Sequence, residues 1–541
     1  MKFPLIQSII KHRRNRCIRR YIRGYRVLKK SNNLNFIKLL KNELSETPVF
    51  DNNIKLSETF FGKDVSNAEI IARQYLIDRI LNISFHKRVL SSIGSNDSCL
   101  YYYIPSNWQD VLIKNGLNVS KKYSYALWIT YCLKMWVYGC VYATLYAYNS
   151  LLGLTQKKSK IINKYVYFDQ ISHNNLPQLN DDKTYNIVTW YLQWSKRSNE
   201  IDSIYHSVRD VKNLEFKGMH IRYIEKPLLP LFDLYNTLKY ILWCFRAALL
   251  SVAGLLKNNP WHALILIESI FNKIAMLHPS KFLAEEYMFH SWTYRPLWTY
   301  EAERKGSRII LYLYSTNNEG FKTENGYRAT NFAWRLVNWP EYLVWDDYQV
   351  NFLKRSIKEV KCIRNVGPIW FSDTPNKMPL IHNNSAAVFD IQPRRDSVHH
   401  SLGIPIHYYV PEVTNKFLVD ISIVLHELGI KMVHKRKRNI GKSIHPKYQK
   451  MTSTLNQNNM VLDINPDVSA LKIIQSCAFV ISMPYTSTAI MAIYHGKPSI
   501  YYDPIGIVEK NDRAAHGVEV VTEINELRRW IRNVEIDESL L

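Results

Sequence analysis

From Glu285 onward, short apolar runs alternate with helix-length runs of amphipathic periodicity. The run "RIILYLYS" at 308–315, for example, is apolar enough for a strand that is buried on both faces of a sheet. Such alternation is typical of a parallel sheet covered by helices on both sides. A polar loop at 372–384 interrupts the pattern once. The sequence therefore predicts an α/β protein with two Rossmann-type domains, 281–380 and 381–541, that face a common cleft.

The N-terminal half is predicted to be a mainly helical region, 31–280, preceded by a basic segment, 1–30. This segment holds eleven Lys or Arg and no acidic residue, and it supplies nearly half of the net charge of +25. A helix of this composition suits an anionic membrane surface, and a solvated basic tail is the alternative. The seven cysteines are scattered, without a C-x-x-C pair, which indicates reduced thiols in a cytoplasmic compartment and no structural zinc.

Two further stretches raise the question of a membrane. Residues 135–154 carry no charge and are long enough to span a bilayer, but they include four tyrosines, which prefer interfaces. The stretch 238–256 is similar and is interrupted by Arg246. We expect both to be buried or membrane-facing helices, with a true span as the alternative.

A cluster of hydroxyl groups follows a predicted strand near the C-terminus. Ser482 ends the apolar run "AFVIS", and Thr486, Ser487 and Thr488 come directly after Pro484, which suits the first turn of a helix. Ligands of parallel α/β sheets bind beyond the carboxyl ends of the strands. Free amides and hydroxyl groups at such a point form an anion site, so the cluster is predicted to bind a phosphate.

A second predicted element is basic. Lys435, Arg436 and Arg438 end the preceding strand-like run, and a loop then leads to His445 and Pro446. Cationic groups and a histidine at a strand end can bind a phosphate or a carboxylate. Its pairing with the hydroxyl cluster, about forty residues later, strengthens both predictions.

Other templates are absent. The sequence has no G-x-x-x-x-G-K-[ST], no G-x-G-x-x-G and no G-x-S-x-G. It also lacks an Asp-x-Asp pair, and no regularly spaced carboxylate or thiolate joins its histidines, so we expect neither a metal nor another cofactor.

The stretches "VFDIQPRRDS" (388–397), "HKRKR" (434–438), His445-Pro446 and "SMPYTSTAIMAIYHGKPSIYYDP" (482–504) resemble the bacterial polysaccharide-biosynthesis proteins named for a Pro-Phe-Thr-Ser motif. Here that motif reads Pro-Tyr-Thr-Ser. The same stretches are more distantly similar to the GT-B sialyltransferases and the capsule Kdo transferases. This resemblance covers about 285–541.

The resemblance implies a GT-B-like fold and a glycosyltransferase of capsule or O-antigen biosynthesis. The donor would be a CMP-activated acidic sugar, either a nonulosonic acid (pseudaminic, legionaminic or sialic acid) or Kdo. The absence of acids between Asp467 and Asp503 agrees with such a donor. The residues expected to bind it are Gln392, Arg394, Lys435, Arg436, Arg438, His445, Pro446, Ser482, Thr486, Ser487 and Thr488.

Transfer requires a carboxylate that accepts the proton of the acceptor hydroxyl. Asp346 and Asp347 in "WDDYQ" end a predicted strand of the first domain, and at most one of them can face the cleft. Asp396 in "QPRRDS" is the alternative, by resemblance to a pattern of the Kdo transferases. His290 and Arg295 are candidates to contact the acceptor or the carboxylate of the donor.

The sequence thus predicts a cytoplasmic glycosyltransferase attached peripherally to the anionic inner-membrane surface. Its acceptor would be a glycan or a lipid-linked oligosaccharide, and region 31–280 would form part of the acceptor domain. A basic nucleic-acid-binding protein and a non-catalytic assembly factor are the alternatives, but the basic residues form no recognisable nucleic-acid module.

Overall fold

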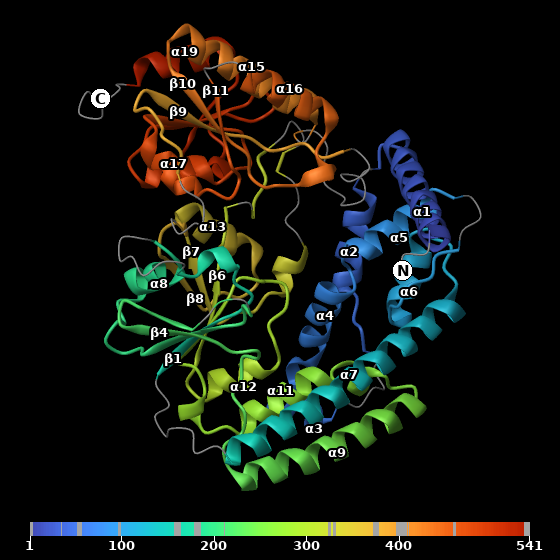
Figure 1. Ribbon diagram of the computed structural model, residues 1–541. Coiled ribbons are helices and arrows are strands. Elements are labelled where there is room, and N and C mark those ends of the chain that lie inside the picture. Colours follow the sequence, from blue (N-terminus) through green and yellow to red (C-terminus); the bar gives the residue numbers. More distant parts are fainter. Residues whose placement is uncertain are drawn as a thin grey trace.

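The structure of the protein is a computed structural model. It describes residues 4–33, 35–50, 57–95, 99–155, 164–177, 185–209, 211, 213–316, 318–322, 326–327, 332–371, 378–395, 408, 410–457 and 461–534. Two α/β domains lie one above the other, with a helical N-terminal region beside the lower one (Figure 1).

The lower domain is built on an eight-stranded sheet with the strand order β3-β4-β2-β1-β5-β6-β7-β8. All neighbouring strands are parallel except the β3–β4 pair. The strands are β1 (Tyr165–Phe168), β2 (Ser203–His206), β3 (Leu214–Phe216), β4 (Met219–Tyr223), β5 (Glu286–Phe289), β6 (Arg308–Tyr312), β7 (Glu341–Val344) and β8 (Cys362–Asn365). The chain leaves β1 toward β2 on one side and returns to β5 on the other, so the switch point of the topology lies between β1 and β5.

Alternate residues of these strands enter two different cores. In β1, Val166 and Phe168 pack with α8 (Ile187–Ser195), whereas Tyr165 and Tyr167 pack with the helical N-terminal region. Burial on both faces explains why β1 is apolar throughout rather than alternating.

The upper domain holds a six-stranded, fully parallel sheet in the order β11-β10-β9-β12-β13-β14. Its strands are β9 (Ser385–Phe389), β10 (Lys431–Lys435), β11 (Val461–Ile464), β12 (Phe479–Ser482), β13 (Ser499–Tyr502) and β14 (Glu519–Val521). Its helices are α15 (Pro411–Glu427), α16 (Pro446–Asn456), α17 (Ala470–Ser476), α18 (Thr488–Tyr494) and α19 (Ile524–Asn533). Here the switch point lies between β9 and β12.

The prediction of two Rossmann-type domains is confirmed, with two corrections. Four strands of the lower sheet come from 165–223, inside the region predicted to be mainly helical. The short apolar run at 367–371, whose composition would suit a strand, forms none, and the edge strand is β8 instead. Strands of three to five residues carry too little periodicity to be recognised between long helices.

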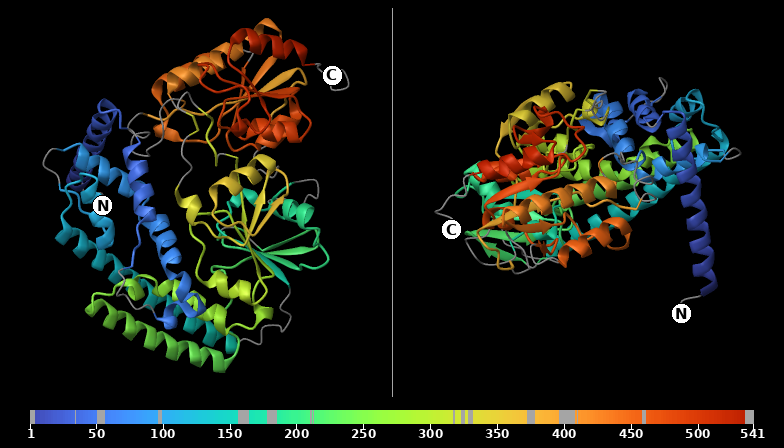
Figure 2. Two further views of the ribbon diagram at one scale, coloured as in Figure 1. Left: turned by 180° about the vertical axis from the view of Figure 1, so that it is seen from behind. Right: turned by 90° about the horizontal axis from the view of Figure 1, so that it is seen from above.

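The other helices are α1 (Pro4–Lys30), α2 (Phe36–Glu46), α3 (Glu58–Phe61), α4 (Ala68–Arg79), α5 (Ile83–Ile93), α6 (Ser106–Lys114), α7 (Lys121–Thr155), α8 (Ile187–Ser195), α9 (Leu234–Leu256), α10 (Trp261–Leu264), α11 (Leu266–Leu277), α12 (Trp298–Arg304) and α13 (Asp347–Ser356). The basic α1 projects from the body of the molecule (Figure 2, right). It is held by α5, where a Cβ on Gly24 would lie 1.9 Å from the carbonyl oxygen of Leu90, so only glycine permits this approach.

Contacts between the two α/β domains fix the facing edges of their sheets. The Phe321 ring, in the segment after β6, lies 4.9 Å from that of Tyr485 in the upper domain. His516 of the upper domain pairs with Asp346 at 2.6 Å, from Nδ1 to Oδ2.

Candidate functional site

The hydroxyl cluster forms a tight turn between β12 and α18. The hydroxyl groups of Ser482 and Thr488 lie 2.8 Å apart, and the Thr486 hydroxyl donates to the Met483 carbonyl, also at 2.8 Å. Tyr485 takes a left-handed conformation with φ 71°, so the helix begins only at Thr488.

This turn corrects two details of the prediction. Pro484 lies four residues before the helix rather than in its first turn, because the left-handed Tyr485 interrupts helical geometry. Ser487 occupies the N-cap position but makes no side-chain cap. Ser482 and Thr486 are buried, and their hydroxyl groups bond within the turn, so they shape the turn.

The carboxyl end of β9 binds the segment that carries the predicted histidine. The Gln392 side chain accepts a hydrogen bond from the Arg438 amide at 3.0 Å. The backbones of Arg394 and Ile444 form an isolated antiparallel β-bridge, and the His445 backbone amide donates to the Pro393 carbonyl at 3.0 Å. Since β9 lies between β10 and β12, Gln392, Arg438, His445 and the hydroxyl turn all lie at one edge of the sheet, around its switch point.

His445 is the N-cap of α16. Its Nδ1 accepts from the Lys447 amide at 3.2 Å, and Pro446 occupies the first position of the helix. In the neutral ring the proton is then on Nε2, which makes this nitrogen a donor. The following proline fixes the backbone of this turn.

Lys435 and Arg436 serve internal contacts rather than the edge of the sheet. The buried Lys435 ammonium donates to the Pro466 carbonyl at 3.1 Å, and burial lowers the pKa of Lys435 to about 8. Arg436 pairs with Asp463 at 2.8 Å. Their spacing at a strand end could not reveal this, because alternate residues of a strand point to opposite faces.

A buried charged network underlies this edge. His434 lies 3.2 Å from Asp390 and 3.5 Å from Asp463, and the Tyr448 hydroxyl donates to Asp390 at 2.6 Å. Burial would lower the pKa of His434, but the two carboxylates outweigh burial and raise it to about 9. Because Tyr448 belongs to α16, the network ties the His445 helix to β9 and β10.

This network makes stability depend on pH. The raised pKa means that the protonated His434 stabilises the fold fully below its ordinary pKa of 6.5, and that this contribution is lost as pH rises through about 9. Between pH 6.5 and 9.5 we expect the free energy of unfolding of the wild type to fall by roughly 2–3 kcal/mol more than that of His434→Gln, since one pKa unit is about 1.4 kcal/mol. Denaturant titrations at the two pH values measure the free energy of unfolding of each protein. Equal falls in both proteins would contradict the pairing.

The predicted acidic pair lies toward the edge of the lower sheet. Asp346 is the N-cap of α13, where it accepts from the Gln349 amide at 2.9 Å, and its other oxygen pairs with His516. Asp347 is exposed, and its carboxylate lies 3.4 Å from the side-chain amide nitrogen of Asn365. Both follow β7, which is three strands, or about 14 Å, from β1. Asp396 lies outside the described residues.

Arg295 is not a surface cation. Its buried guanidinium donates to the Thr299 hydroxyl and to the Asn338 carbonyl, each at 3.1 Å, and it pairs with Glu303. Every nitrogen of this side chain is committed to internal contacts, which contradicts the predicted role at the cleft. The apolar strand that precedes it gave no sign that the following turn folds inward.

The switch point of the lower sheet carries a carboxylate that the sequence reasoning missed. Asp169 directly follows β1, and burial raises the pKa of its partly exposed carboxyl to about 6 while a hydrogen bond with Tyr167 opposes the rise. Its amide donates to the Met288 carbonyl of β5 at 2.9 Å. The available signal was the run "YVYFD", an apolar strand that ends in an acid.

His290 lies beside Asp169, at the end of the neighbouring β5. Burial lowers its pKa, and its ring hydrogen-bonds the Asp169 backbone. Its Nδ1 is buried and has no hydrogen-bond partner among the described residues. The Tyr314 ring lies 6.0 Å from that of His290, and the Arg438 charge of the upper domain opposes the burial-induced rise in the pKa of Tyr314. The charge of Arg438 thus acts on Tyr314 across the boundary between the two domains.

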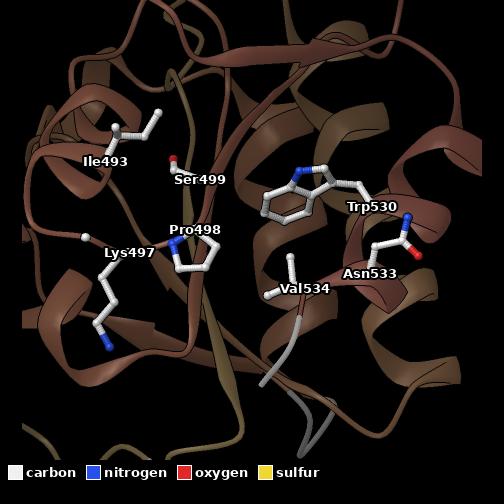
Figure 3. Close-up of a pocket in the computed structure, with 8 residues that line it drawn as sticks. Ile493, Lys497, Pro498, Ser499, Trp530, Asn533 and Val534 are labelled. Carbon is white, nitrogen blue, oxygen red and sulfur yellow. The ribbon is translucent and has the colours of Figure 1, made fainter. Parts of the chain in front are cut away.

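Two surface hollows lie away from this region. One, of about 680 Å³, is bordered by Lys497, Pro498, Ser499 and Trp530, at the amino end of β13 (Figure 3). The other, of about 920 Å³, lies between Tyr348 and the β14–α19 edge. Neither is lined by the predicted donor-binding residues, and the amino end of a parallel strand is not where these sheets bind ligands.

Two facing Rossmann-type domains, each with polar groups at the switch point of its sheet, define a GT-B-like α/β protein. Residues 240–531 match the family described as "Polysaccharide biosynthesis PFTS motif protein", and this is more than half of the 541 residues. The chain belongs to that family, as its Pro-Tyr-Thr-Ser motif predicted.

Similar solved structures include HepE of Anabaena in complex with UDP and glucose, which is 11% identical over 70% of this chain and 90% of that chain, with a TM-score of 0.37. The wall teichoic acid polymerase TagF is 8% identical, with 76% and 92% covered and a TM-score of 0.37. The UDP-GlcNAc 2-epimerase of Methanocaldococcus jannaschii is 9% identical, with 70% and 94% covered and a TM-score of 0.36. No curated protein matches the chain in a sequence search.

Proposed function

We propose that this chain is a glycosyltransferase of polysaccharide biosynthesis, which moves a sugar from a nucleotide donor to a glycan or lipid-linked oligosaccharide acceptor. The observation that supports it best is the contact between the facing edges of the two domains, where the Phe321 ring of the lower domain lies 4.9 Å from that of Tyr485 in the hydroxyl turn. Such a two-sided site suits group transfer, because donor and acceptor must be held in a fixed relative geometry.

The upper edge suits the nucleotide. His445 Nε2–H and the cationic side chains of Arg438 and Arg394 can donate to a phosphate, and the hydroxyl turn borders the same edge of the sheet. We assign the donor as a CMP-activated acidic sugar, a nonulosonic acid or Kdo, because it carries one phosphate and one carboxylate and the segment between Asp467 and Asp503 has no acid to repel them. A nucleoside diphosphate sugar is the alternative donor.

The lower edge suits the acceptor. The acceptor hydroxyl oxygen attacks the anomeric carbon of the donor, and the bond from that carbon to the phosphate oxygen breaks with its electron pair leaving on CMP. Asp169 is placed to accept the hydroxyl proton, and its pKa of about 6 leaves it ionised at neutral pH. The unpartnered Nδ1 of His290 can accept a hydrogen bond from a second hydroxyl group of the acceptor.

Nucleotide release tests this function. The purified chain is incubated with CMP-activated acidic sugars or with UDP-sugars, each with and without a glycan acceptor, and free nucleotide is measured. We expect acceptor-dependent release of CMP. Release of UDP alone would overturn the donor assignment. Nucleotide binding without release from either donor class would favour a non-catalytic assembly factor and overturn the proposal.

A further inference from the structure

Helices α7 and α9 turn an apolar surface toward solvent. On α9, Leu242, Phe245 and Leu249 are 67–72% exposed, and on α7, Leu145 and Tyr148 are 53% and 59% exposed. Within each helix these residues are spaced by three or four positions, so each set forms a single stripe. A surface helix of a globular protein ordinarily has its polar face outside. Here that arrangement is reversed.

The opposite faces of the two helices are packed against protein. Thr237, Tyr240, Ala247 and Ser251 of α9 are buried, and the Trp243 indole donates to the Thr59 carbonyl at 3.1 Å. The helices run antiparallel, since Trp136 of α7 bonds the Ala248 carbonyl while Tyr240 of α9 bonds the Ala143 carbonyl. They form the outer layer at the bottom of Figure 1, on the side of the lower domain remote from the upper domain.

The packing of α9 bears on whether this helix spans a membrane or lies on its surface. Among the described residues, α9 is the one helix long and apolar enough to cross a membrane, and 17% of its apolar window is buried. The buried face of α9 is bound to α7, α10 and α11 along its length, so the helix cannot leave the body to cross a bilayer without losing that packing. It can instead lie flat, with the apolar stripe in the lipid.

The charges of this surface select an anionic partner. Neither α7 nor α9 contains an acidic residue. Exposed cations beside the apolar stripes include Lys134, Lys239 and Arg246. Lys134 and Lys239 lie over tyrosine rings, with the Lys239 ammonium 4.0 Å from the Tyr235 centroid. Tyrosine and a snorkelling lysine beside an apolar stripe suit the headgroup layer of a bilayer. A second copy of the chain would bring these like charges together.

We infer that the outer face of α7 and α9 is inserted into the interfacial layer of an anionic bilayer, with both helix axes parallel to the membrane. This attachment adds to the one predicted for the basic α1, and it does not depend on the proposed activity. It places the lower domain, which would hold the acceptor, next to the membrane.

Vesicle flotation tests the inference. The full chain is floated with phosphatidylcholine vesicles with and without 30% phosphatidylglycerol, roughly the range in which surface charge matters. We expect Phe245→Glu/Leu249→Glu to lower the ratio of bound to free protein at least tenfold on anionic vesicles. Lys239→Gln/Arg246→Gln should lower it severalfold on anionic vesicles and hardly at all on neutral ones. Ile423→Glu, at an exposed apolar residue of α15, is the matched control and should bind like the wild type.

Circular dichroism and thermal unfolding establish that the variants are folded. Unchanged flotation of Phe245→Glu/Leu249→Glu would overturn the inference. So would a wild type that ignores vesicles but forms a concentration-dependent dimer that the same double variant abolishes, because the face would then be a self-interface.

Discussion

Replacing Asp169 by Asn should reduce turnover at least a hundredfold and leave nucleotide affinity unchanged. The reason is that the amide has the shape of the carboxylate but cannot accept the acceptor proton, and a general base contributes roughly 10²–10⁴ in rate. Asp169 lies on the lower sheet, whereas the groups proposed to bind the phosphate lie on the upper one, so binding should not change. Steady-state rates and calorimetric titrations measure the two quantities.

The pH dependence of turnover tests whether Asp169 is the general base. A base must be deprotonated to act, so wild-type turnover should fall as pH drops through about 6, the pKa to which burial raises Asp169. The residual activity of Asp169→Asn should lack this acid limb. Asp347→Asn is the matched control, because Asp347 is exposed near the sheet edge, and it should keep near-normal turnover. If Asp347→Asn loses turnover while Asp169→Asn does not, the base is the one predicted from "WDDYQ".

Replacing His445 by Ala should weaken CMP binding tenfold to a hundredfold. One hydrogen bond to a charged phosphate is lost, and such bonds contribute about 1.5–3 kcal/mol. His445 also caps α16, so part of the loss reflects a less ordered turn. Isothermal titration of CMP into each protein gives the affinities.

His426→Ala is the control for this substitution. His426 is exposed in the last turn of α15, and the variant should bind CMP like the wild type. A folded His445→Ala variant with wild-type affinity would show that the phosphate is bound elsewhere.

The upper domain was largely predictable from sequence. Its central strands β9, β10, β12 and β13 are short, mostly buried runs, and α15 between β9 and β10 begins at Pro411 and is followed by Gly429, so the period changes clearly there. The edge strands β11 and β14 are less buried, and the alternation did not reveal them. The Pro-Tyr-Thr-Ser motif identified the family, and its position after β12 placed it at the carboxyl edge without any knowledge of the fold.

The lower domain was predicted less well. The strands β1 to β4 are three to five residues long and are separated by irregular segments and helices, and β5 begins more than sixty residues after β4 ends. Without β1, the switch point could not be located, and Asp169 could not be recognised as a residue beside it. Only tertiary pairing of β1 with β5 reveals that position.

Side-chain direction was the other limit. Arg295 and Lys435 have the residue types of a binding site, but the fold turns them inward, onto Glu303 and the Pro466 carbonyl. Asp346 has the position expected of a base, but it caps α13 and pairs with His516 of the other domain. These contacts join segments that are far apart in sequence, so no local pattern encodes them.

The central claim is that the nucleotide binds at the carboxyl edge of the upper sheet, between the two domains. A crystal structure of the chain with CMP tests it most directly. The account predicts a phosphate oxygen at about 2.7–3.2 Å from His445 Nε2, with the hydroxyl turn of Ser482–Thr488 beside it. CMP bound in the hollow next to Trp530, at the opposite end of the sheet, with the His445 edge empty, would contradict it.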